Sequence, residues 1–293
     1  MKLLSALKLK RIQRHTFFLL SGLLLSGLLL PSAFATTPVS FIAESFNLRY
    51  DNPDDGINAW PHRKLMVLTH LKTLQPDVVG MQEVLAHQLD WLDKNLQDYS
   101  YFGVGRDDGK RAGEFVPLLY NHTKVQQLDG GNFWLSETPN KAGSIGWLAH
   151  LPRVVSWGHF KKADKEFFVF DAHFSHVSDL ARKKSAEFLM RYIPTISKDK
   201  PVVLLGDFNT LDSEPAYKTL LTPAEITFTD VAKAPNATAL STFNGFGHYD
   251  SNRIDYILIS GGLSGHHYQT HKIHADGVYI SDHFPISVSL TFE

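Results

Sequence analysis

Short apolar runs recur along the chain, and most of them are bounded by Gly, Pro, Asn or Asp. Runs of this length that are rich in β-branched and aromatic residues are typical of β-strands. The pattern therefore predicts strands over residues 39–46, 77–82, 115–120, 154–160, 167–174, 201–206, 253–260 and 286–292.

Helical periodicity is clearest over residues 179–196, where Ser178 is the expected N-cap. The apolar side chains of this segment that share one helix face are Leu189, Tyr192, Ile193 and Ile196. A second helix is predicted over residues 61–74, because Pro61 suits the first helical position. Its leucines lie roughly on one side of the helix, at Leu65, Leu68, Leu71 and Leu74. A third helix is expected over residues 86–96.

The predicted strands outnumber the helices, and the two do not alternate regularly as they do in a barrel or a fully parallel sheet. We therefore expect an α/β fold in which two mixed β-sheets pack face to face with flanking helices, a four-layer αββα sandwich. No linker, charge run or internal repeat divides the chain after residue 35. One domain over residues 36–293 is the simplest interpretation.

Residues 1–35 have the order of a secretory signal peptide. A basic start is followed by an apolar stretch over residues 17–30 and by Ala33-Phe34-Ala35, after which we expect cleavage. The alternative is an uncleaved membrane anchor, but the apolar stretch is shorter than the about 20 residues that span a bilayer. We therefore expect an exported protein, periplasmic or secreted, with no stable membrane anchor after cleavage.

The composition agrees with a packed globular domain, since 43% of the residues are hydrophobic and 12% are aromatic. The chain has no Cys, and a domain of this size can rely on its core rather than on disulfides. Five of the 29 Lys and Arg residues lie within residues 1–35, and the chain has 30 Asp and Glu residues. The part that follows the predicted signal peptide is therefore acidic.

Polar residues stand at the ends of several predicted strands, where a rigid scaffold can hold catalytic groups. Asn47 and Glu83 follow the first two strands, and His173 closes a later one. A carboxylate at the end of a buried strand needs a partner, and Mg²⁺ is one candidate for Glu83. Taken singly, Asn47 is also explained as a turn residue, and Glu83 as a carboxylate at a helix N-terminus.

A stronger signal comes from the second half of the chain. Asp207 and Asn209 follow an apolar strand that ends in glycine, and an extended backbone would place both side chains on one side. Asp255 opens another strand, and Asp282 and His283 come just before the final one. A buried structural Asp–His pair is the alternative explanation for the last two residues.

Six segments of this kind follow one another in a characteristic order: Ser45-Phe46-Asn47, Gln82-Glu83, the His173 segment, Gly206-Asp207-Phe208-Asn209, Arg253-Ile254-Asp255-Tyr256 and Ser281-Asp282-His283. In these segments the chain resembles the endonuclease/exonuclease/phosphatase superfamily, and the resemblance spans nearly all of residues 36–293. It implies the fold of pancreatic-type deoxyribonucleases and the metal-dependent hydrolysis of a phosphoester.

The resemblance also implies roles for individual residues. His283 would be the general base or the imidazole that polarises the phosphate, and Asp255 would orient it. Glu83, assisted by Asn47 and Asp282, would hold Mg²⁺ or Mn²⁺, whose other ligands would be waters and a substrate oxygen.

The remaining implied roles concern the water and the substrate. Asp207 and Asn209 would position or activate the attacking water and contact the phosphate. His173 would donate a hydrogen bond to a non-bridging phosphate oxygen, and Arg153 would add positive charge nearby. Glu114 would serve the leaving-group side, with a surface salt bridge as the equal alternative.

Two further segments suggest other sites. Residues 266–274 are rich in histidine, and on a strand His267 and His271 would share a face. We interpret this segment as an exposed strand, with a zinc site as the alternative, because no carboxylate motif lies nearby in the sequence. Residues 103–108 begin like a dinucleotide-binding loop but lack the third glycine and the following helix, so we expect a substrate-side loop.

These observations predict a divalent-metal-dependent phosphoesterase that acts on a phosphodiester or phosphomonoester of a small or lipid-derived molecule. A secreted nuclease is the alternative. A non-catalytic binding module is disfavoured, since every residue type that the chemistry needs is present. The acidic balance and the lack of a Lys/Arg run favour a small substrate over nucleic acid as the partner. The sequence leaves the oligomeric state open.

Overall fold

The computed structural model describes residues 38–293 except 236 and 250–251. The predicted signal peptide and its cleavage point therefore lie outside the described residues. Among the residues that the structure does describe, no helix has the length and apolar character needed to cross a membrane.

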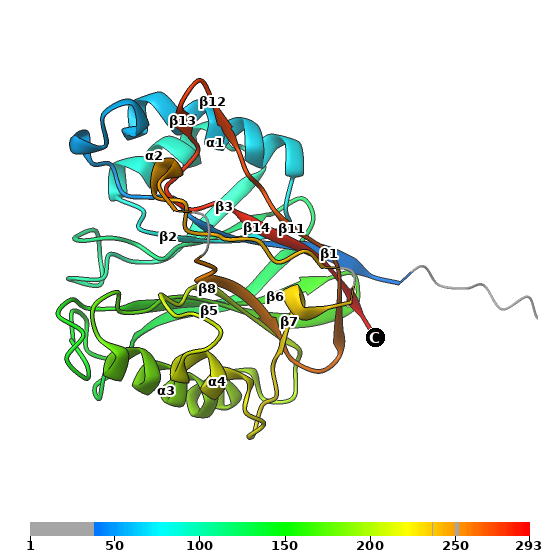
Figure 1. Ribbon diagram of the computed structural model, residues 1–293. Helices are drawn as coiled ribbons and strands as arrows, with labels where there is room; N and C mark the ends of the chain where they lie inside the picture. Colours follow the sequence, from blue (N-terminus) through cyan, green and yellow to red (C-terminus); the bar gives the residue numbers. More distant parts are fainter. Residues whose placement is uncertain (1–37, 236, 250–251) are drawn as a thin grey trace, which may run out of the picture. The chain divides into compact units, whose positions relative to one another are not determined.

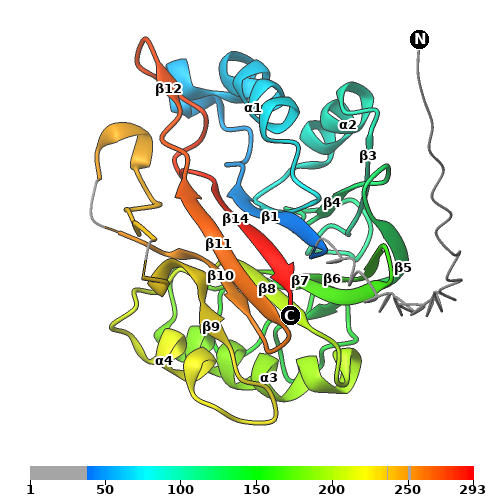
Figure 2. The same ribbon diagram turned by 90° about the vertical axis from the view of Figure 1, so that its right-hand side faces the viewer.

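Strand β1 lies inside the first of two six-stranded sheets. It pairs antiparallel with β14 and parallel with β2, so this sheet is mixed. In spatial order the strands are β11 (Leu263–Thr270), β14 (Ile286–Phe292), β1 (Ser40–Asn47), β2 (Val78–Gln82), β4 (Leu118–Asn121) and β3 (Tyr99–Phe102). Figure 2 shows β11, β14 and β1 side by side.

The second six-stranded sheet is also mixed, because β7 and β8 run parallel while the other neighbours run antiparallel. In spatial order its strands are β5 (Gln126–Trp134), β6 (Val154–Lys162), β7 (Lys165–His173), β8 (Val202–Asp207), β10 (Asp255–Ile259) and β9 (Thr229–Asp230). A separate two-stranded ribbon consists of β12 (His274–Ala275) and β13 (Val278–Tyr279).

Helices cover the outer faces of the two sheets (Figure 1). The first sheet carries α1 (Trp60–Leu74) and α2 (Ala86–Asn95), and the second carries α3 (Asp179–Ser197) and α4 (Pro215–Leu221). Three short 3₁₀ helices lie in the connections, η1 (Pro53–Asn58), η2 (Val231–Lys233) and η3 (Gly245–Gly247). The predicted four-layer αββα sandwich is therefore confirmed.

Aromatic and branched side chains fill the space between the sheets. Phe41 of β1 stacks on Phe167 of β7 with the ring centroids 4.2 Å apart. Val203 and Leu205 of β8 belong to the same buried cluster. Burying one such side chain contributes about 1.5–3 kcal/mol to the free energy of unfolding. This packing holds the strand ends, and the polar residues on them, at fixed positions.

The three predicted helices are present, and Ser178 caps α3 as expected. The predicted leucine side of α1 is only partly buried: Leu71 is buried, whereas Leu65 is 63% exposed. The other buried residues of this helix include Arg63, Val67 and His70. The leucine periodicity misled the prediction because this helix buries two polar side chains. Arg63 donates hydrogen bonds to backbone carbonyls of neighbouring segments, and His70 contacts a carboxylate of the sheet below.

The predicted strands are also present, most with ends that differ by one to a few residues. The strand predicted over 115–120 is shortened to β4, because Pro117 has no N–H to donate to a ladder. Phe115 instead forms isolated bridges. The sequence pattern missed β3 and β5, and β5 is an edge strand with two central glycines and much of its length exposed.

Candidate active site

Strand ends from both sheets bring polar side chains together at the end of the sandwich opposite the C-terminus of the chain (Figure 1). Asn47 is the last residue of β1, His173 the last of β7 and Asp207 the last of β8. The register of the second sheet places both His173 and Asp255 beside Asp207. Since β1 and β8 pack against each other, Asn47 reaches the same point from the first sheet.

Glycine precedes Asp207 for a steric reason. Gly206 has a φ of 143°, and a Cβ atom there would lie 1.9 Å from the carbonyl oxygen of Ala172 on the neighbouring strand β7. No other residue fits this close approach without moving the backbone. The glycine thus lets β8 deliver Asp207 close to the end of β7.

Asp207 is the centre of the cluster and is almost fully buried. Its Oδ2 atom accepts a hydrogen bond from Asn47 Nδ2 at 3.0 Å. The Nε2 atoms of His173 and His283 lie 3.6 and 3.8 Å from the same oxygen. Burial raises the pKa of Asp207 to about 7, and the charge of Asp255 adds to this effect. Asp207 can therefore take up or release a proton near neutral pH.

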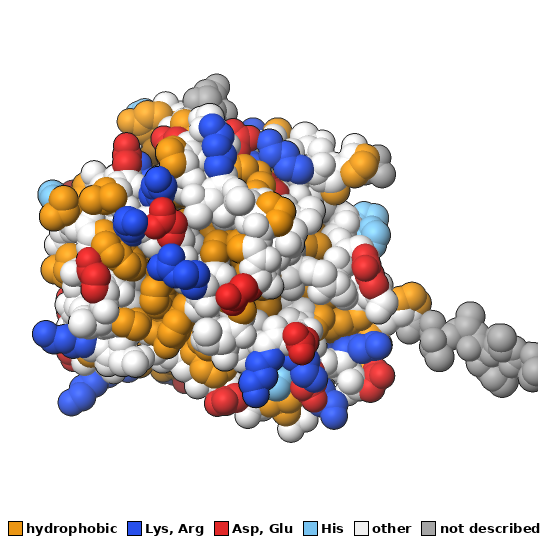
Figure 3. Space-filling model, turned by 90° about the horizontal axis from the view of Figure 1, so that it is seen from below, with side chains coloured by type: hydrophobic (Ala, Val, Ile, Leu, Met, Phe, Trp, Pro, Cys, Tyr) orange, Lys and Arg blue, Asp and Glu red, His pale blue; other side chains and the backbone are white. Residues whose placement is uncertain are grey.

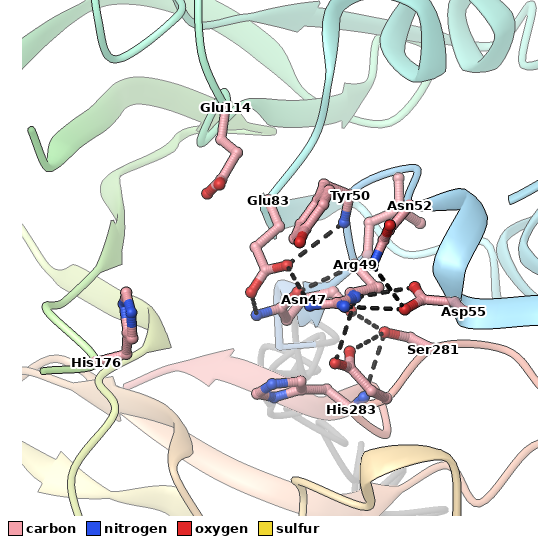
Figure 4. Close-up of polar contacts among 12 residues, drawn as sticks. Asn47, Arg49, Tyr50, Asn52, Asp55, Glu83, Glu114, His176, Ser281 and His283 are labelled. Carbon is pink, nitrogen blue, oxygen red and sulfur yellow. Dashed lines mark hydrogen bonds and ion pairs between the residues drawn. The ribbon is translucent and has the colours of Figure 1, made fainter. Parts of the chain in front are cut away.

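His283 is fixed from two sides. Its Nδ1 atom lies 2.9 Å from Asp255 Oδ2. Its backbone N–H donates to Ser281 Oγ at 3.2 Å (Figure 4). Burial alone would lower the pKa of His283, but the carboxylates of Asp255 and Asp207 outweigh it and hold the pKa well above its usual range. The imidazole is therefore positively charged at neutral pH.

Glu83 shares with Asp207 the amide group of Asn47 as a hydrogen-bond donor. Its Oε1 atom accepts a hydrogen bond from Asn47 Nδ2 at 3.2 Å, and its Oε2 atom accepts one from the Tyr50 N–H at 3.4 Å (Figure 4). The Arg49 guanidinium lies between two carboxylates, 3.9 Å from Glu83 Oε2 and 3.7 Å from Asp282 Oδ2. The three predicted metal ligands, Glu83, Asn47 and Asp282, are thus brought together.

This donor set fits a divalent cation, because two carboxylates already converge on the single positive charge of Arg49. Burial raises the pKa of Asp282, and the negative charge of Glu83 contributes to the shift. Ligand atoms of Glu83, His173 and Asp207 also lie within 4.8 Å of one another. Carboxylate and amide oxygens are the ligands that Mg²⁺ and Mn²⁺ prefer. The residues present therefore suit such an ion.

Arg153 and His173 line the cavity and can donate hydrogen bonds into it. Arg153 is only 4% exposed, and its Nε and Nη1 atoms have no hydrogen-bond partner among the described residues. Its Nη2 atom lies 2.9 Å from His176 Nδ1. Burial lowers the pKa of His173 well below its usual range, and the charges of Arg153 and Arg106 contribute, so this ring is neutral. An anion bound in the cavity beside Arg153 would accept hydrogen bonds from these unpaired donors.

A cavity of about 660 Å³ opens between these groups. Glu114 lies on its rim with Oε2 2.6 Å from Arg106 Nη1, and burial raises the pKa of the Glu114 carboxyl. Figure 4 shows Glu114 and His176 apart from the cluster around Arg49. The sequence-predicted residues that line the cavity are Glu83, Glu114, Arg153, His173, Asp207, Asn209, Asp282 and His283. The other two, Asn47 and Asp255, contact this lining from behind.

The expectation of an extended backbone at Asn209 is wrong. Asn209 has a φ of 47°, its N–H donates to Asp207 Oδ1 at 2.9 Å, and its Nδ2 donates to the Phe174 carbonyl at 3.2 Å. Arg49 and Glu83 also adopt positive φ values, 59° and 61°. Such conformations are uncommon for residues other than glycine and cluster at functional sites.

Sequence reasoning missed several residues of the site. Arg49 lines the cavity, and the His176 Nδ1 atom lies beside Arg153 Nη2. A buried pair behind the site was also missed, in which Gln82 Nε2 donates to Asp171 Oδ1 at 2.7 Å. The position of Arg49, two residues after Asn47, could have indicated that it belongs to the site. Its partners Glu83 and Asp282 come from distant segments, so its contacts could not be predicted from the local sequence.

The two additional segments are also placed by the structure. Arg106 from the loop 103–108 lines the cavity. The expectation that His267 and His271 share a strand face is wrong, because β11 has an irregular register between His266 and Gln269 and ends at Thr270. His267 is exposed, whereas His271 is half-buried.

The sequence matches the Endonuclease/Exonuclease/phosphatase family over residues 45–283. A solved endonuclease/exonuclease/phosphatase from Bacteroides vulgatus is 37% identical with a TM-score of 0.82, over 87% of this chain and 100% of that chain. A mannosyl-6-phosphatase from Bacteroides thetaiotaomicron is 32% identical with a TM-score of 0.79, over 86% of this chain and 100% of that chain.

Among curated proteins, nocturnin of Drosophila melanogaster is 27% identical over 182 residues, which are 58% of this chain and 27% of nocturnin. An uncharacterized protein of Acanthamoeba polyphaga mimivirus is 25% identical over 166 residues, 54% of this chain and 62% of that protein. The matches therefore span less than two thirds of either relative. The family match and the B. vulgatus structure cover most of the described chain. The chain belongs to the endonuclease/exonuclease/phosphatase family, whose members hydrolyse phosphoesters.

Proposed function

We propose that this chain is a metal-dependent phosphatase that removes the phosphate group from a phosphorylated sugar. The observation that carries the proposal is the buried Arg153, whose Nε and Nη1 atoms lack partners among the described residues beside the cavity. A phosphate monoester offers two negative charges, and charge-assisted hydrogen bonds from Arg are among the strongest in proteins. The similarity to a mannosyl-6-phosphatase supports a hexose phosphate as the substrate class.

Glu83, with Asn47 and Asp282, would hold the divalent cation, for which we propose Mg²⁺ or Mn²⁺. When bound, the cation supplies positive charge that offsets the charge developing on the phosphate. Arg49 forms two hydrogen bonds with Asp55, at 2.9 and 3.0 Å. Arg49 therefore keeps a partner when Glu83 and Asp282 serve as ligands.

The residues around Asp207 would activate the attacking water and bind the phosphate. Asp207, with a pKa of about 7, would accept the proton of the attacking water, and the Asn209 N–H holds its carboxylate in place. Because His283 is charged, we assign it the role of polarising a phosphate oxygen from Nε2 rather than that of general base. Asp255 fixes the ring by its bond to Nδ1, and the neutral His173 would donate to a second oxygen.

The other end of the cavity would receive the sugar. Burial and the charge of Glu83 raise the pKa of Glu114, which suits the donation of a proton to the departing sugar oxygen. Arg106 holds the Glu114 side chain at 2.6 Å. A volume of about 660 Å³ is ample for a hexose phosphate and lies in the usual range for small-molecule sites.

The face over α3 and α4 offers nucleic acid no continuous positive surface (Figure 3). Proteins that bind nucleic acid present surfaces rich in Lys and Arg to the phosphates. On the face over α3 and α4, blue and red side chains are interspersed (Figure 3). On α3, for example, Lys184 Nζ lies 2.8 Å from Glu187 Oε2. A nuclease would need a positive surface elsewhere on the molecule.

We further propose that the protein acts outside the cytoplasm, in the periplasm or secreted, after removal of residues 1–35. The support is the order of basic, apolar and small residues in that segment. N-terminal sequencing of exported protein should then begin at or near Thr36. Recovery of intact Met1 in a membrane fraction would contradict this proposal.

A substrate panel tests the activity. The purified mature protein is assayed with Mg²⁺ on hexose phosphates, inositol phosphates, nucleotides, phospholipids, DNA and RNA. We expect the highest kcat/KM on a hexose phosphate, and Arg153→Ala should raise its KM by about 10–100-fold. Arg111→Ala is the matched control, because Arg111 is exposed and pairs with Asp90. A higher kcat/KM on DNA or RNA would overturn the proposal.

A further inference from the structure

A buried carboxylate lies beneath α1, outside the cavity described above. Glu44 of β1 is 0% exposed, and its Oε1 atom contacts Nε2 of His70 on α1. Its Oε2 atom has no hydrogen-bond partner within residues 38–293, the three undescribed positions aside. A buried carboxylate with an unpaired oxygen is unfavourable, so a further positive partner is expected.

His271 approaches the same point from the segment that follows β11. Its ring centroid lies 4.8 Å from that of His70, and its Nε2 atom lies 2.8 Å from Ser287 Oγ. Because Nε2 is engaged by Ser287, the Nδ1 atom of His271 is the ring nitrogen that would serve as a ligand. One ligand atom each from Glu44, His70 and His271 lie within 4.8 Å of one another.

We propose that Glu44, His70 and His271 form a second metal site, which takes zinc. Two imidazole nitrogens and one carboxylate oxygen, with a water as the fourth ligand, are a common zinc set. Ligand atoms around a tetrahedral zinc ion are about 3.4 Å apart, so small side-chain rotations, which include a widening of the Glu44–His70 contact, would fit the three ligands to the ion. Ser287 would orient His271 through its other nitrogen, as partners of metal-bound histidines do.

A surface pocket reaches one of the three proposed ligands, His70, and offers an ion a path towards the site. A pocket of about 440 Å³ reaches His70 between α1 and the segment after β11. It is lined by Leu65, Met66, Thr69, His70, Thr73 and Ile273. The carboxylate that the sequence of residues 266–274 lacks is therefore supplied by Glu44, from a strand at the other end of the chain.

The chemistry of this second site differs from that of the cavity. The ligands around Glu83 are mainly oxygen atoms, which suit Mg²⁺, whereas imidazole nitrogens favour zinc over Mg²⁺. A zinc ion here would tie β1, α1 and the chain before β14 together. Since β1 ends at Asn47, it would stabilise the strand that leads into the active site.

Zinc titration in a large excess of Mg²⁺ tests the proposal. The metal-stripped mature protein is titrated with zinc by calorimetry, and the bound zinc is measured by elemental analysis. We expect the wild type to bind one zinc ion that Glu44→Gln and His271→Ala do not bind. Glu83→Gln and His267→Ala should keep it, because Glu83 belongs to the other site and His267 is exposed. Zinc should raise the Tm of the wild type but not of His271→Ala.

Cobalt provides a readout that needs no variant. Co²⁺ bound to the wild type in excess Mg²⁺ should give the intense visible absorption of a four-coordinate ion. Absence of this absorption would overturn the proposal. Equal zinc binding by wild type and by a His271→Ala variant that has the wild-type circular dichroism spectrum would also overturn it, as would loss of the zinc ion in Glu83→Gln.

Discussion

The Nδ1 atom of His283 lies 2.9 Å from Asp255 Oδ2, and this contact joins the two sheets at the active site. Asp255 opens β10 of the second sheet, and His283 stands just before β14 of the first. The bond leaves Nε2 free to face Asp207, 3.8 Å away. Residues from opposite halves of the sandwich therefore form one hydrogen-bonded unit.

Removal of His283 should lower kcat by about 10²–10⁴, because the charged imidazole would no longer polarise the phosphate. Asp207→Ala should have a comparable effect. The double variant should lose far less than the product of the two single effects, since residues that act as one unit are not additive. Steady-state kinetics on the best substrate of the panel measures this. Near-normal turnover by His283→Ala would refute its assignment, and His267→Ala is the control.

The pH dependence of kcat/KM follows from the same pair. Asp207 accepts a proton only when deprotonated, and its pKa is raised to about 7, first by burial and then by Asp255. Activity should therefore rise with pH through about 7. The pKa of His283 lies well above its usual range, so the loss of its charge should limit activity only in the alkaline range. A pH–rate profile already at its plateau at about pH 5 would contradict these roles.

Chelation should abolish activity, and Mg²⁺ or Mn²⁺ should restore it, because Glu83 and Asp282 would be left without their ion. Glu83→Gln should raise the Mg²⁺ concentration needed for half-maximal activity by at least about tenfold, while the far-UV circular dichroism stays unchanged. Glu137→Gln, a change at an exposed position, is the control. Full activity in excess chelator would exclude the proposed metal site.

The sequence predicted the architecture well because the strands of both sheets are encoded by short local patterns of apolar residues. Apolar runs bounded by turn residues marked most strands, and polar residues placed after them marked Asn47, Glu83 and Asp207. The position of each of these side chains is set by the end of the strand that precedes it. Local patterns are therefore sufficient wherever a rigid strand determines the position of a residue.

Features that depend on partners distant in the sequence could not be predicted this way. The role of Arg49 depends on Glu83 and Asp282, which come from two other segments. The burial of His70 on α1 could not be predicted, because its polar partner is Glu44, a carboxylate of β1. Asn209 departs from an extended strand because its N–H turns back to Asp207, which the alternation of side chains does not reveal.

The buried Asp171 should lower stability at neutral pH. Burial raises its pKa well above the usual range, so the folded state keeps a proton that the unfolded chain releases above about pH 4. Its destabilising effect therefore grows as pH rises from about 4 towards the folded-state pKa. Asp171→Asn keeps the acceptor for Gln82 Nε2, and it should raise the free energy of unfolding at pH 7 by about 1–3 kcal/mol.

Urea denaturation at pH 7 and at pH 4 measures this effect. The gain from Asp171→Asn should shrink at pH 4, because there the carboxyl is protonated in the folded state and about half protonated in the unfolded chain. Asp129→Asn, at an exposed position of β5, should show no such gain. A loss of stability in Asp171→Asn at pH 7 would mean that the ionised carboxylate stabilises the fold.

The proposed hydrolysis of a phosphate monoester is tested most directly by comparing two substrates, a hexose 6-phosphate and its methyl phosphodiester. The quantity measured is the ratio of kcat/KM for the monoester to kcat/KM for the diester. The monoester carries one more negative charge for the unpaired N–H groups of Arg153 and the charged His283. We predict a ratio above about ten in wild type, since one charge-assisted hydrogen bond is worth at least that factor. A ratio at or below one, or no hydrolysis of either compound, would contradict the account.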